Sequence, residues 1–257
     1  MEIKTLGPLE ITSGERLYTP SGTKMRQMLA LLLSNANSVV STDSITEELW
    51  GDDPPRSVHT TLQTYIYKLR KDLVREFPGD ALENALVTRA PGYKLAVPPE
   101  RIDATAFERM AREGRLLLQS GRPAEALETL TAAIGLWSGD VMENVQSSRR
   151  LQSHALRLQE LRIESLQLRI KAKIELGRCH ELIPELRALA EEYPLNEWFH
   201  GQLMYALTRS GRRSEALDAY QRLRTILGDE LGLEPSNEIQ RLQLEILRDD
   251  GDMVPIG

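Results

Sequence analysis

The sequence predicts a mainly α chain, with a small α+β part in its first 97 residues and an all-α part of helical hairpins after them. Three observations predict this fold class. Short stretches that alternate apolar and polar residues occur before residue 98, and from Asp103 onward apolar residues recur at helical spacing. A helix breaker centred on glycine recurs after 34 residues, at Gly177 and Gly211. We therefore predict two domains, 1–97 and 98–257.

The first domain reads as a sheet, three helices and a hairpin. Residues 3–20 alternate in short pieces separated by turn residues, which predicts a small antiparallel sheet. Apolar residues at helical spacing predict a helix over 23–35. A second, short helix is predicted to begin at the capping residues Ser41-Thr42-Asp43 and to run to Trp50. A third helix follows Pro54-Pro55, over 56–75, and two strand-like runs at 86–89 and 93–97 predict a hairpin. This order is that of a winged helix-turn-helix domain.

The second domain is predicted to consist of helices over about 103–119, 122–137, 152–177, 179–192, 195–210, 213–228 and 236–249. Pro184 is expected to kink or delay the fourth of them. Residues 121–127 and 211–217 have nearly the same sequence, and each segment has an alanine, Ala126 or Ala216, five residues after its glycine. The 34-residue period is that of the tetratricopeptide repeat. We expect three irregular helical hairpins, with an insertion around 138–153.

Composition excludes several classes of protein. With 41% hydrophobic and 27% charged residues the chain is typical of soluble globular proteins. Its apolar runs are far shorter than the roughly 20 residues of a membrane helix, and no signal peptide is recognisable, so we expect a cytoplasmic protein without a membrane partner. The single Cys179 excludes an internal disulfide, and the four histidines are scattered. We expect no enzyme activity, no cofactor and no metal.

Charge along the chain is uneven, which matters more than the net charge of −6. Residues 1–97 carry 11 lysine or arginine against 12 acidic residues, and residues 98–257 carry 21 against 26. Within 56–75, however, five cations stand against the single anion Asp72. A local excess of this kind indicates a nucleic-acid contact, and the acidic remainder should limit non-specific DNA binding.

The outer face of helix 56–75 has hydroxyl groups in its first half and cations in its second. Hydroxyls reach base edges and cations reach phosphates, so this is the pattern of a DNA recognition helix. The alternative is an ordinary solvated surface. The candidate DNA contacts on this helix are Arg56, Ser57, Thr60, Thr61, Thr64, Tyr67, Lys68, Arg70, Lys71 and Arg75.

The chain also resembles a known family. The resemblance runs through Leu6-Gly7-Pro8-Leu9, Glu48-Leu49-Trp50, Leu69-Arg70, Gly92-Tyr93 and residues 231–236. In their order and spacing these residues are similar to the Streptomyces antibiotic regulatory protein family, activators with an OmpR-type winged helix and a tetratricopeptide-like bacterial transcriptional activator domain. The resemblance implies an activator of a secondary-metabolite gene cluster that binds direct repeats in promoter DNA as a head-to-tail homodimer and recruits RNA polymerase holoenzyme.

The resemblance also implies contacts at individual positions. Tyr65 would approach the major groove, unless it packs inside the domain, and Arg89 in the hairpin would lie near the minor groove, whose negative potential attracts arginine. Family members of the response-regulator kind usually have Asp and His where this chain has Gln63 and Tyr65, so a base preference does not carry over. Gln63 could instead pair with adenine if it faces the groove, although a helical wheel places it toward the side. Two other functions stay open: a ligand- or peptide-sensing helical scaffold with a winged-helix output, and a protein adaptor without a DNA role.

Overall fold

The computed structural model describes residues 2–80, 82–146 and 148–248. The chain begins with three short antiparallel strands, β1 (Glu2–Lys4), β2 (Glu10–Ser13) and β3 (Arg16–Tyr18), which confirms the predicted sheet. Ile3 of β1 pairs with Ile11 of β2, and both side chains are buried. The alternation in the sequence therefore marks the face of this sheet that turns to the core.

Three helices follow the sheet: α1 (Thr23–Ser34), α2 (Thr42–Trp50) and α3 (Val58–Glu76). The Oγ of Ser41 accepts a hydrogen bond from the backbone N of Ser44 at 3.0 Å, so the predicted cap of α2 is present. Helix α3 begins two residues later than the sequence predicts. A turn closed by a 3.0 Å hydrogen bond from Val58 N to Pro55 O holds Arg56 and Ser57 in front of the helix.

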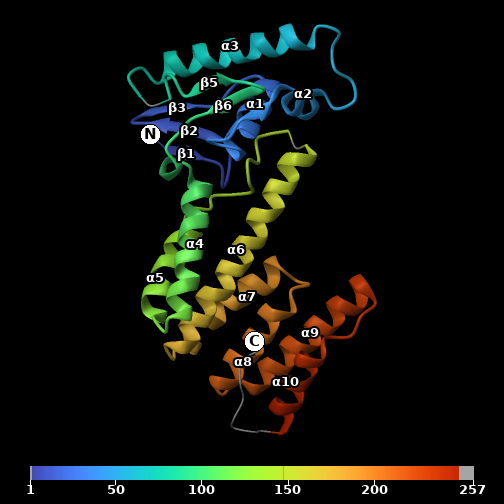
Figure 1. Cartoon of the computed structure of the whole chain (residues 1–257). Helices are drawn as coiled ribbons and strands as arrows, with labels where there is room; N and C mark the ends of the chain where they lie inside the picture. Colours follow the sequence, from blue (N-terminus) through green and yellow to red (C-terminus); the bar gives the residue numbers. More distant parts are fainter. Residues whose placement is uncertain (1, 81, 147, 249–257) are drawn as a thin grey trace. The chain divides into compact units, whose positions relative to one another are not determined.

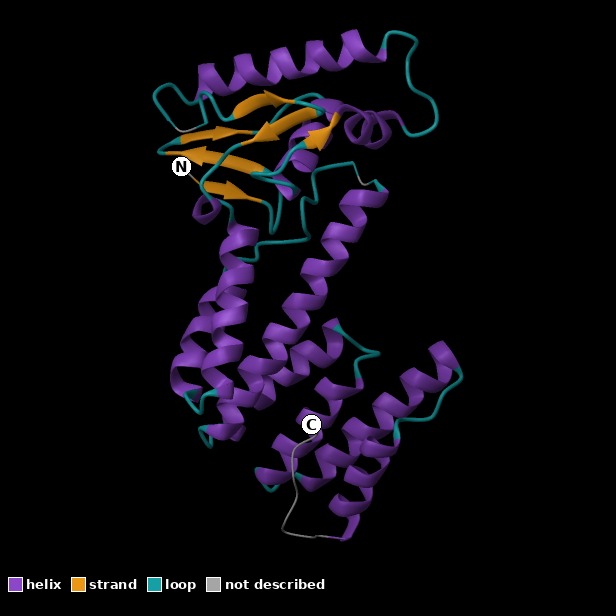
Figure 2. Ribbon diagram, in the orientation of Figure 1, coloured by secondary structure: helices purple, strands orange, loops and turns teal. Residues whose placement is uncertain are grey.

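A second sheet contains the predicted hairpin. Its strands β4 (Val40–Ser41), β5 (Leu86–Arg89) and β6 (Gly92–Leu95) lie in the order β4-β6-β5. Figures 1 and 2 show α3 running along the strands of this part of the chain, with α1 and α2 beside it. Strand β4 is not predicted by the sequence, because two residues are too few to show an alternating pattern. This arrangement is a winged helix-turn-helix, as predicted.

The remainder is helical, as predicted. It contains a 3₁₀ turn η1 (Pro99–Arg101), α4 (Asp103–Gln119), α5 (Pro123–Ile134), α6 (Arg149–Glu175), a 3₁₀ turn η2 (Cys179–Glu181), α7 (Leu182–Glu192), α8 (Glu197–Arg209), α9 (Arg213–Leu231) and α10 (Asn237–Arg248). Pro184 lies in the first turn of α7, where its missing N–H costs nothing, so it delays the helix rather than kinking it. The predicted end of the last helix, residue 249, lies outside the described residues. No helix within the described ranges is long and apolar enough to cross a membrane.

The expected insertion is a mostly non-helical segment between α5 and α6, and it packs against the N-terminal strands. The backbone N of Ser138 donates to Leu6 O at 2.7 Å, and that of Met142 donates to Thr5 O at 3.0 Å. Leu9 N donates to Oδ1 of Asn144 at 2.8 Å. The insertion is therefore an additional partner of the first sheet.

Asp103, the first residue of α4, binds the same strand end. Its carboxylate accepts hydrogen bonds from Thr5 N at 2.8 Å, from Thr5 Oγ1 at 2.6 Å and from Leu6 N at 3.0 Å. It also accepts from its own neighbour Ala104 N at 2.7 Å, and its negative charge lies at the N-terminus of α4, where the helix dipole favours an anion. One aspartate therefore joins the start of the helical part to the sheet.

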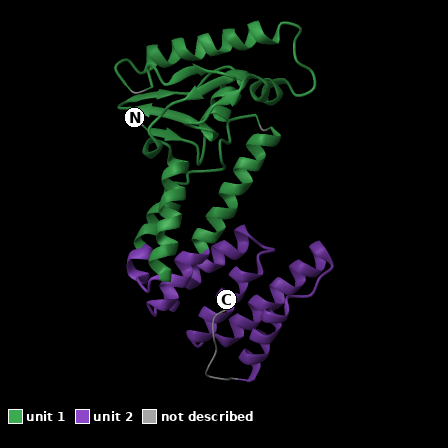
Figure 3. Cartoon of the chain, viewed as in Figure 1, with its two compact units in different colours: residues 1–119, 128–166 green, residues 120–127, 167–257 purple. Residues whose placement is uncertain are grey.

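The chain divides into two compact units, residues 1–119 with 128–166 and residues 120–127 with 167–257, shown in Figure 3. The first unit thus contains the winged helix together with α4, part of α5 and the first part of α6. The predicted domain boundary between residues 97 and 98 divides the chain by sequence pattern. The two compact units divide it by contacts between residues, so their boundaries differ from the predicted one.

In the second unit, the glycines and alanines that recur in the sequence lie at helix ends and in buried positions. Gly121, Gly177 and Gly211 all have positive φ, of 70°, 73° and 71°, the left-handed conformation with which helices often end. Ala126 and Ala216, five residues after two of these glycines, are fully buried. Their small side chains let neighbouring helices approach closely.

Candidate nucleic-acid interface

Helix α3 has one fully buried face and one exposed face. Leu62, Ile66, Leu69 and Leu73 are each at most 2% exposed, which fixes the rotation of the helix about its axis. Val58, four residues before Leu62 and so on the same side of the helix, is half-buried at its start. The residues on the opposite side are therefore held toward solvent by the packing of the apolar stripe.

Most of the predicted contacts lie on this exposed face or just before it. Thr61, Tyr65 and Arg70 are half-buried at its margins. Arg89, at the end of β5, is exposed in the wing. The exposed members of the set are Arg56, Ser57, Thr60, Thr64, Tyr67, Lys68, Lys71 and Arg75.

The cations in the second half of α3 differ in how far their charges are compensated. Lys68 and Lys71 form no ion pair with any described residue and line an open groove of about 610 Å³ between α3 and residues 21–25. Arg75 lies 3.2 Å from Asp72 and 2.7 Å from Glu76, and its hydrogen bond to Glu76 raises its pKa. Lys68 and Lys71 are therefore better candidates for phosphate contacts than Arg75.

Arg70 holds the wing against the helix. Its Nε donates to Leu86 O at 2.9 Å and its Nη2 to Thr88 Oγ1 at 2.8 Å, while the guanidinium lies 6.0 Å from the ring centre of Tyr93. These contacts reach both strands of the hairpin. Arg70 therefore positions the wing, and its charge sits beside the interface.

We expect Arg70→Ala to lower the free energy of unfolding of the first unit by roughly 2 kcal/mol, because two hydrogen bonds from a cation are lost and one of them is exposed. It should also weaken DNA binding by loosening the wing. Urea unfolding and DNA titration at several salt concentrations measure both effects. Unchanged stability with a salt slope smaller by about 1 would instead identify Arg70 as a phosphate ligand.

The aromatic residue Tyr65 belongs to the packing between α2 and α3. Its ring stacks on Trp50, with centroids 6.1 Å apart and an angle of 12° between the planes. Both rings are half-buried against the core of the first unit. Tyr65 therefore fixes the recognition helix to the helix before it, and its predicted DNA contact stays a prediction.

Three exposed residues of α3, His59, Gln63 and Val74, are missing from the predicted set. Gln63 is exposed, three residues after Thr60 and four before Tyr67, so it continues the same stripe. It also lies two turns before Arg70, on the flank that carries the wing. The position of Gln63 on this stripe can be derived from its spacing to Thr60 and Tyr67, although its uncharged side chain does not stand out on a basic helix.

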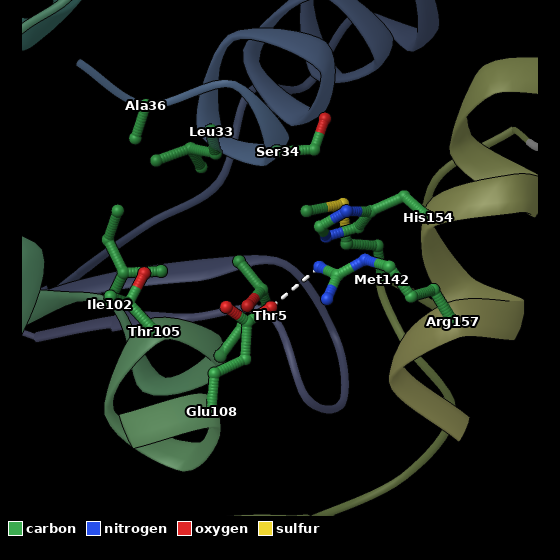
Figure 4. A pocket seen from close by; sticks show the side chains of 11 residues that line it. Thr5, Leu33, Ser34, Ala36, Ile102, Thr105, Glu108, Met142, His154 and Arg157 are labelled. Carbon is green, nitrogen blue, oxygen red and sulfur yellow. Dashed lines mark hydrogen bonds and ion pairs between the residues drawn. The ribbon is translucent and has the colours of Figure 1, made fainter. Parts of the chain in front are cut away.

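A small cavity lies elsewhere in the first unit, between the end of α1 and helices α4 and α6. Figure 4 shows His154 and Arg157 of α6 extending toward Thr5 and Glu108, with Arg157 2.6 Å from Glu108. Burial lowers the pKa of His154. The cavity holds about 140 Å³, less than the 300 Å³ at which small-molecule sites begin, so it is too small for a drug-sized ligand.

Two family models match the chain. The bacterial transcriptional activator domain matches residues 102–247, and the C-terminal domain of transcriptional regulatory proteins matches residues 19–95. The first match includes the insertion between α5 and α6 and the start of α4 at Asp103. The second includes α1, α2, α3 and the wing.

Relatives match over nearly the whole chain. The regulatory protein DnrI of Streptomyces peucetius is 40% identical over 97% of this chain and 93% of its own length. The transcriptional regulator RedD of Streptomyces coelicolor is 32% identical over 97% of this chain and 71% of its own length. A solved structure of Mycobacterium tuberculosis EmbR in complex with a low affinity phosphopeptide has a TM-score of 0.87 and 33% identity, covering 96% of this chain and 65% of that one.

Proposed function

The chain belongs to the Streptomyces antibiotic regulatory protein family of transcriptional activators, and from this premise we propose that it switches on a secondary-metabolite gene cluster by binding direct repeats in its promoter DNA. Helix α3 enters the major groove and the wing, with Arg89 at its tip, follows the backbone into the adjacent minor groove.

The exposed face of α3 is the observation that carries this proposal. A B-DNA major groove is about 12 Å wide and admits one α-helix. The stripe from Thr60 to Lys71 offers short polar side chains first and two uncompensated lysines afterwards. Short side chains let the helix approach base edges closely, while the longer lysines reach the phosphates.

The helical part serves protein contacts in this proposal. Residues 98–257 carry five more acidic than basic residues, so they are repelled by the DNA backbone rather than attracted to it. Family membership suggests two protomers head to tail on neighbouring repeats, and contact with RNA polymerase holoenzyme. Both contacts then fall to helices α4 to α10 or to their loops.

Lys68→Ala and Lys71→Ala should each weaken binding to a promoter fragment and lower the slope of log K against log salt concentration by about 0.9, since each variant loses one phosphate contact. Arg89→Ala should weaken binding as well. Titrations between low and physiological salt measure the slope. Lys4→Ala is the matched control, because Lys4 is an exposed cation of the same unit that lies on β1.

The same proteins test activation. In transcription reconstituted with polymerase holoenzyme, the full chain and the Lys4 variant should raise the amount of transcript, while Lys68→Ala and Lys71→Ala should raise it less at equal protein concentration. Binding and activation that are unchanged in both lysine variants would refute the DNA surface assigned to α3.

A further inference from the structure

We propose that Gln63 reads an adenine in the major groove of the promoter, which makes it a specificity-determining residue of the site. This inference rests on the proposed DNA-binding function and adds a base preference to it. It starts from the position of Gln63 on the exposed stripe of α3, on the flank that faces the wing.

The side chain of Gln63 is available for a partner. In the part of the chain that the structure describes, its amide makes no hydrogen bond. The neighbouring threonines, by contrast, make hydrogen bonds within the helix: Thr61 Oγ1 donates to Ser57 O at 3.0 Å and Thr64 Oγ1 donates to Thr60 O at 2.8 Å. The hydroxyl protons of these threonines are thus used within the helix, and the amide of Gln63 stays open.

The residue best suited to read guanine is occupied elsewhere. Arginine recognises guanine with two parallel N–H donors, and Arg70 is the arginine within α3 nearest to Gln63. Two of its nitrogens already donate to Leu86 O and Thr88 Oγ1 in the wing. The exposed polar side chains left on this flank of the helix are His59 and Gln63, and the carboxamide of Gln63 is the one whose donor and acceptor can face the same base edge together.

The carboxamide selects adenine by its pattern of donor and acceptor. Its Nε2 donates to N7 of adenine while its Oε1 accepts from the N6 amino group. Guanine presents two acceptors at these places, so Oε1 would face O6 without a proton between them. Cytosine presents only its amino donor and thymine only an acceptor beside a methyl group. Adenine is the base that pairs with both ends of the side chain.

Thr64 strengthens the same preference. Because its hydroxyl proton is donated back to Thr60 O, Thr64 offers the groove its methyl group and the acceptor lone pairs of Oγ1, but no donor. A methyl group packs favourably on the C5 methyl of thymine and gains nothing from the amino group of cytosine. The first half of α3 thus favours an A·T pair over a G·C pair where these side chains meet the DNA.

The test compares the wild-type full-length protein, Gln63→Ala and Gln63→Glu on promoter duplexes in which each base pair of the footprint is changed in turn. The wild type should prefer adenine at one position by between about 5-fold and 150-fold. Gln63→Ala should lose that preference and keep the others. Gln63→Glu, which only accepts, should shift the preference toward cytosine.

A single-atom substitution sharpens the result. Replacing the chosen adenine by 7-deazaadenine removes the acceptor N7, so it should weaken binding of the wild type and leave binding of Gln63→Ala unchanged. Gln221→Ala, an exposed glutamine on α9 in the other unit, is the matched control and should keep the wild-type profile.

Three results would overturn the inference. The base profile of Gln63→Ala could equal that of the wild type, the lost preference could be for a base other than adenine, or 7-deazaadenine could weaken both proteins equally. Failure of the wild type to bind any promoter fragment is a separate result, since it would refute DNA binding itself.

Discussion

Gly92→Ala is expected to destabilise the first unit by about 3 kcal/mol or more, at the upper end of the cost of overpacking, and to abolish DNA binding at moderate temperature. A Cβ at this position would overlap the carbonyl oxygen of Val40 and lie 2.7 Å from Cα of Ser41. Both obstacles are backbone atoms of β4, which cannot rotate away as a side chain can. Relief requires breaking the pairing of Ser41 with Gly92, which holds the wing to the start of α2.

Urea unfolding followed by tryptophan fluorescence measures this effect. Trp50 and Trp137 lie in the first unit and Trp198 in the second, so Trp198→Phe should serve as the background for all variants. Gly228→Ala is the control: a Cβ there meets nothing within 4 Å and α9 belongs to the second unit, so this variant should keep the unfolding curve that Trp50 and Trp137 report for the background. Equal stability of the Gly92 variant and its background would show that the wing adapts.

The second large effect is expected for Asp103→Ala, which should lower the free energy of unfolding of the first unit by roughly 3 kcal/mol. Its carboxylate accepts hydrogen bonds from the backbone of Thr5 and Leu6, and these two residues are at most 1% exposed. Without it, two buried N–H groups are left unpaired, at about 1–3 kcal/mol each.

Asp140→Ala is the matched control in the same unit, because Asp140 is exposed and its side chain makes no hydrogen bond or ion pair with described residues. As an ordinary surface substitution it should stay within about 0.5 kcal/mol of the background. If both aspartate variants unfold at the same urea concentration, the link between β1 and α4 contributes little.

The sequence predicts well those elements whose signal is local. Helix α3 is recognisable because Leu62, Ile66, Leu69 and Leu73 recur at the period of a helix. The buried Ala126 and Ala216 are recognisable because each lies in the repeated segment that begins with a glycine. The exposed face of α3 follows from its buried face by simple geometry. The sequence alone therefore predicts that most of the candidate contacts lie on one surface.

Long-range pairing is what local patterns do not contain. The insertion between α5 and α6 shows no periodicity, and its partners Leu6 and Leu9 lie more than 130 residues earlier in the chain. Arg70 illustrates the same limit within the site, because a positive charge on a basic helix predicts a phosphate, whereas the fold offers it two acceptors in the wing. Charge alone does not distinguish a ligand of DNA from a ligand of the protein.

The carboxylate of Asp103 also bears on how such regulators exchange parts. A recombination event that joined a foreign DNA-reading segment at residue 97 would separate Thr5 from Asp103 and Leu9 from Asn144. The hybrid would recognise a new operator in principle, but Asp103 and Asn144 would find backbone N–H partners only if the foreign loop after the first strand follows the same path. We expect viable hybrids to inherit the first compact unit, residues 1–119 and 128–166, from one parent, so that new promoter preferences arise more readily by substitutions within α3 than by replacement of residues 1–97.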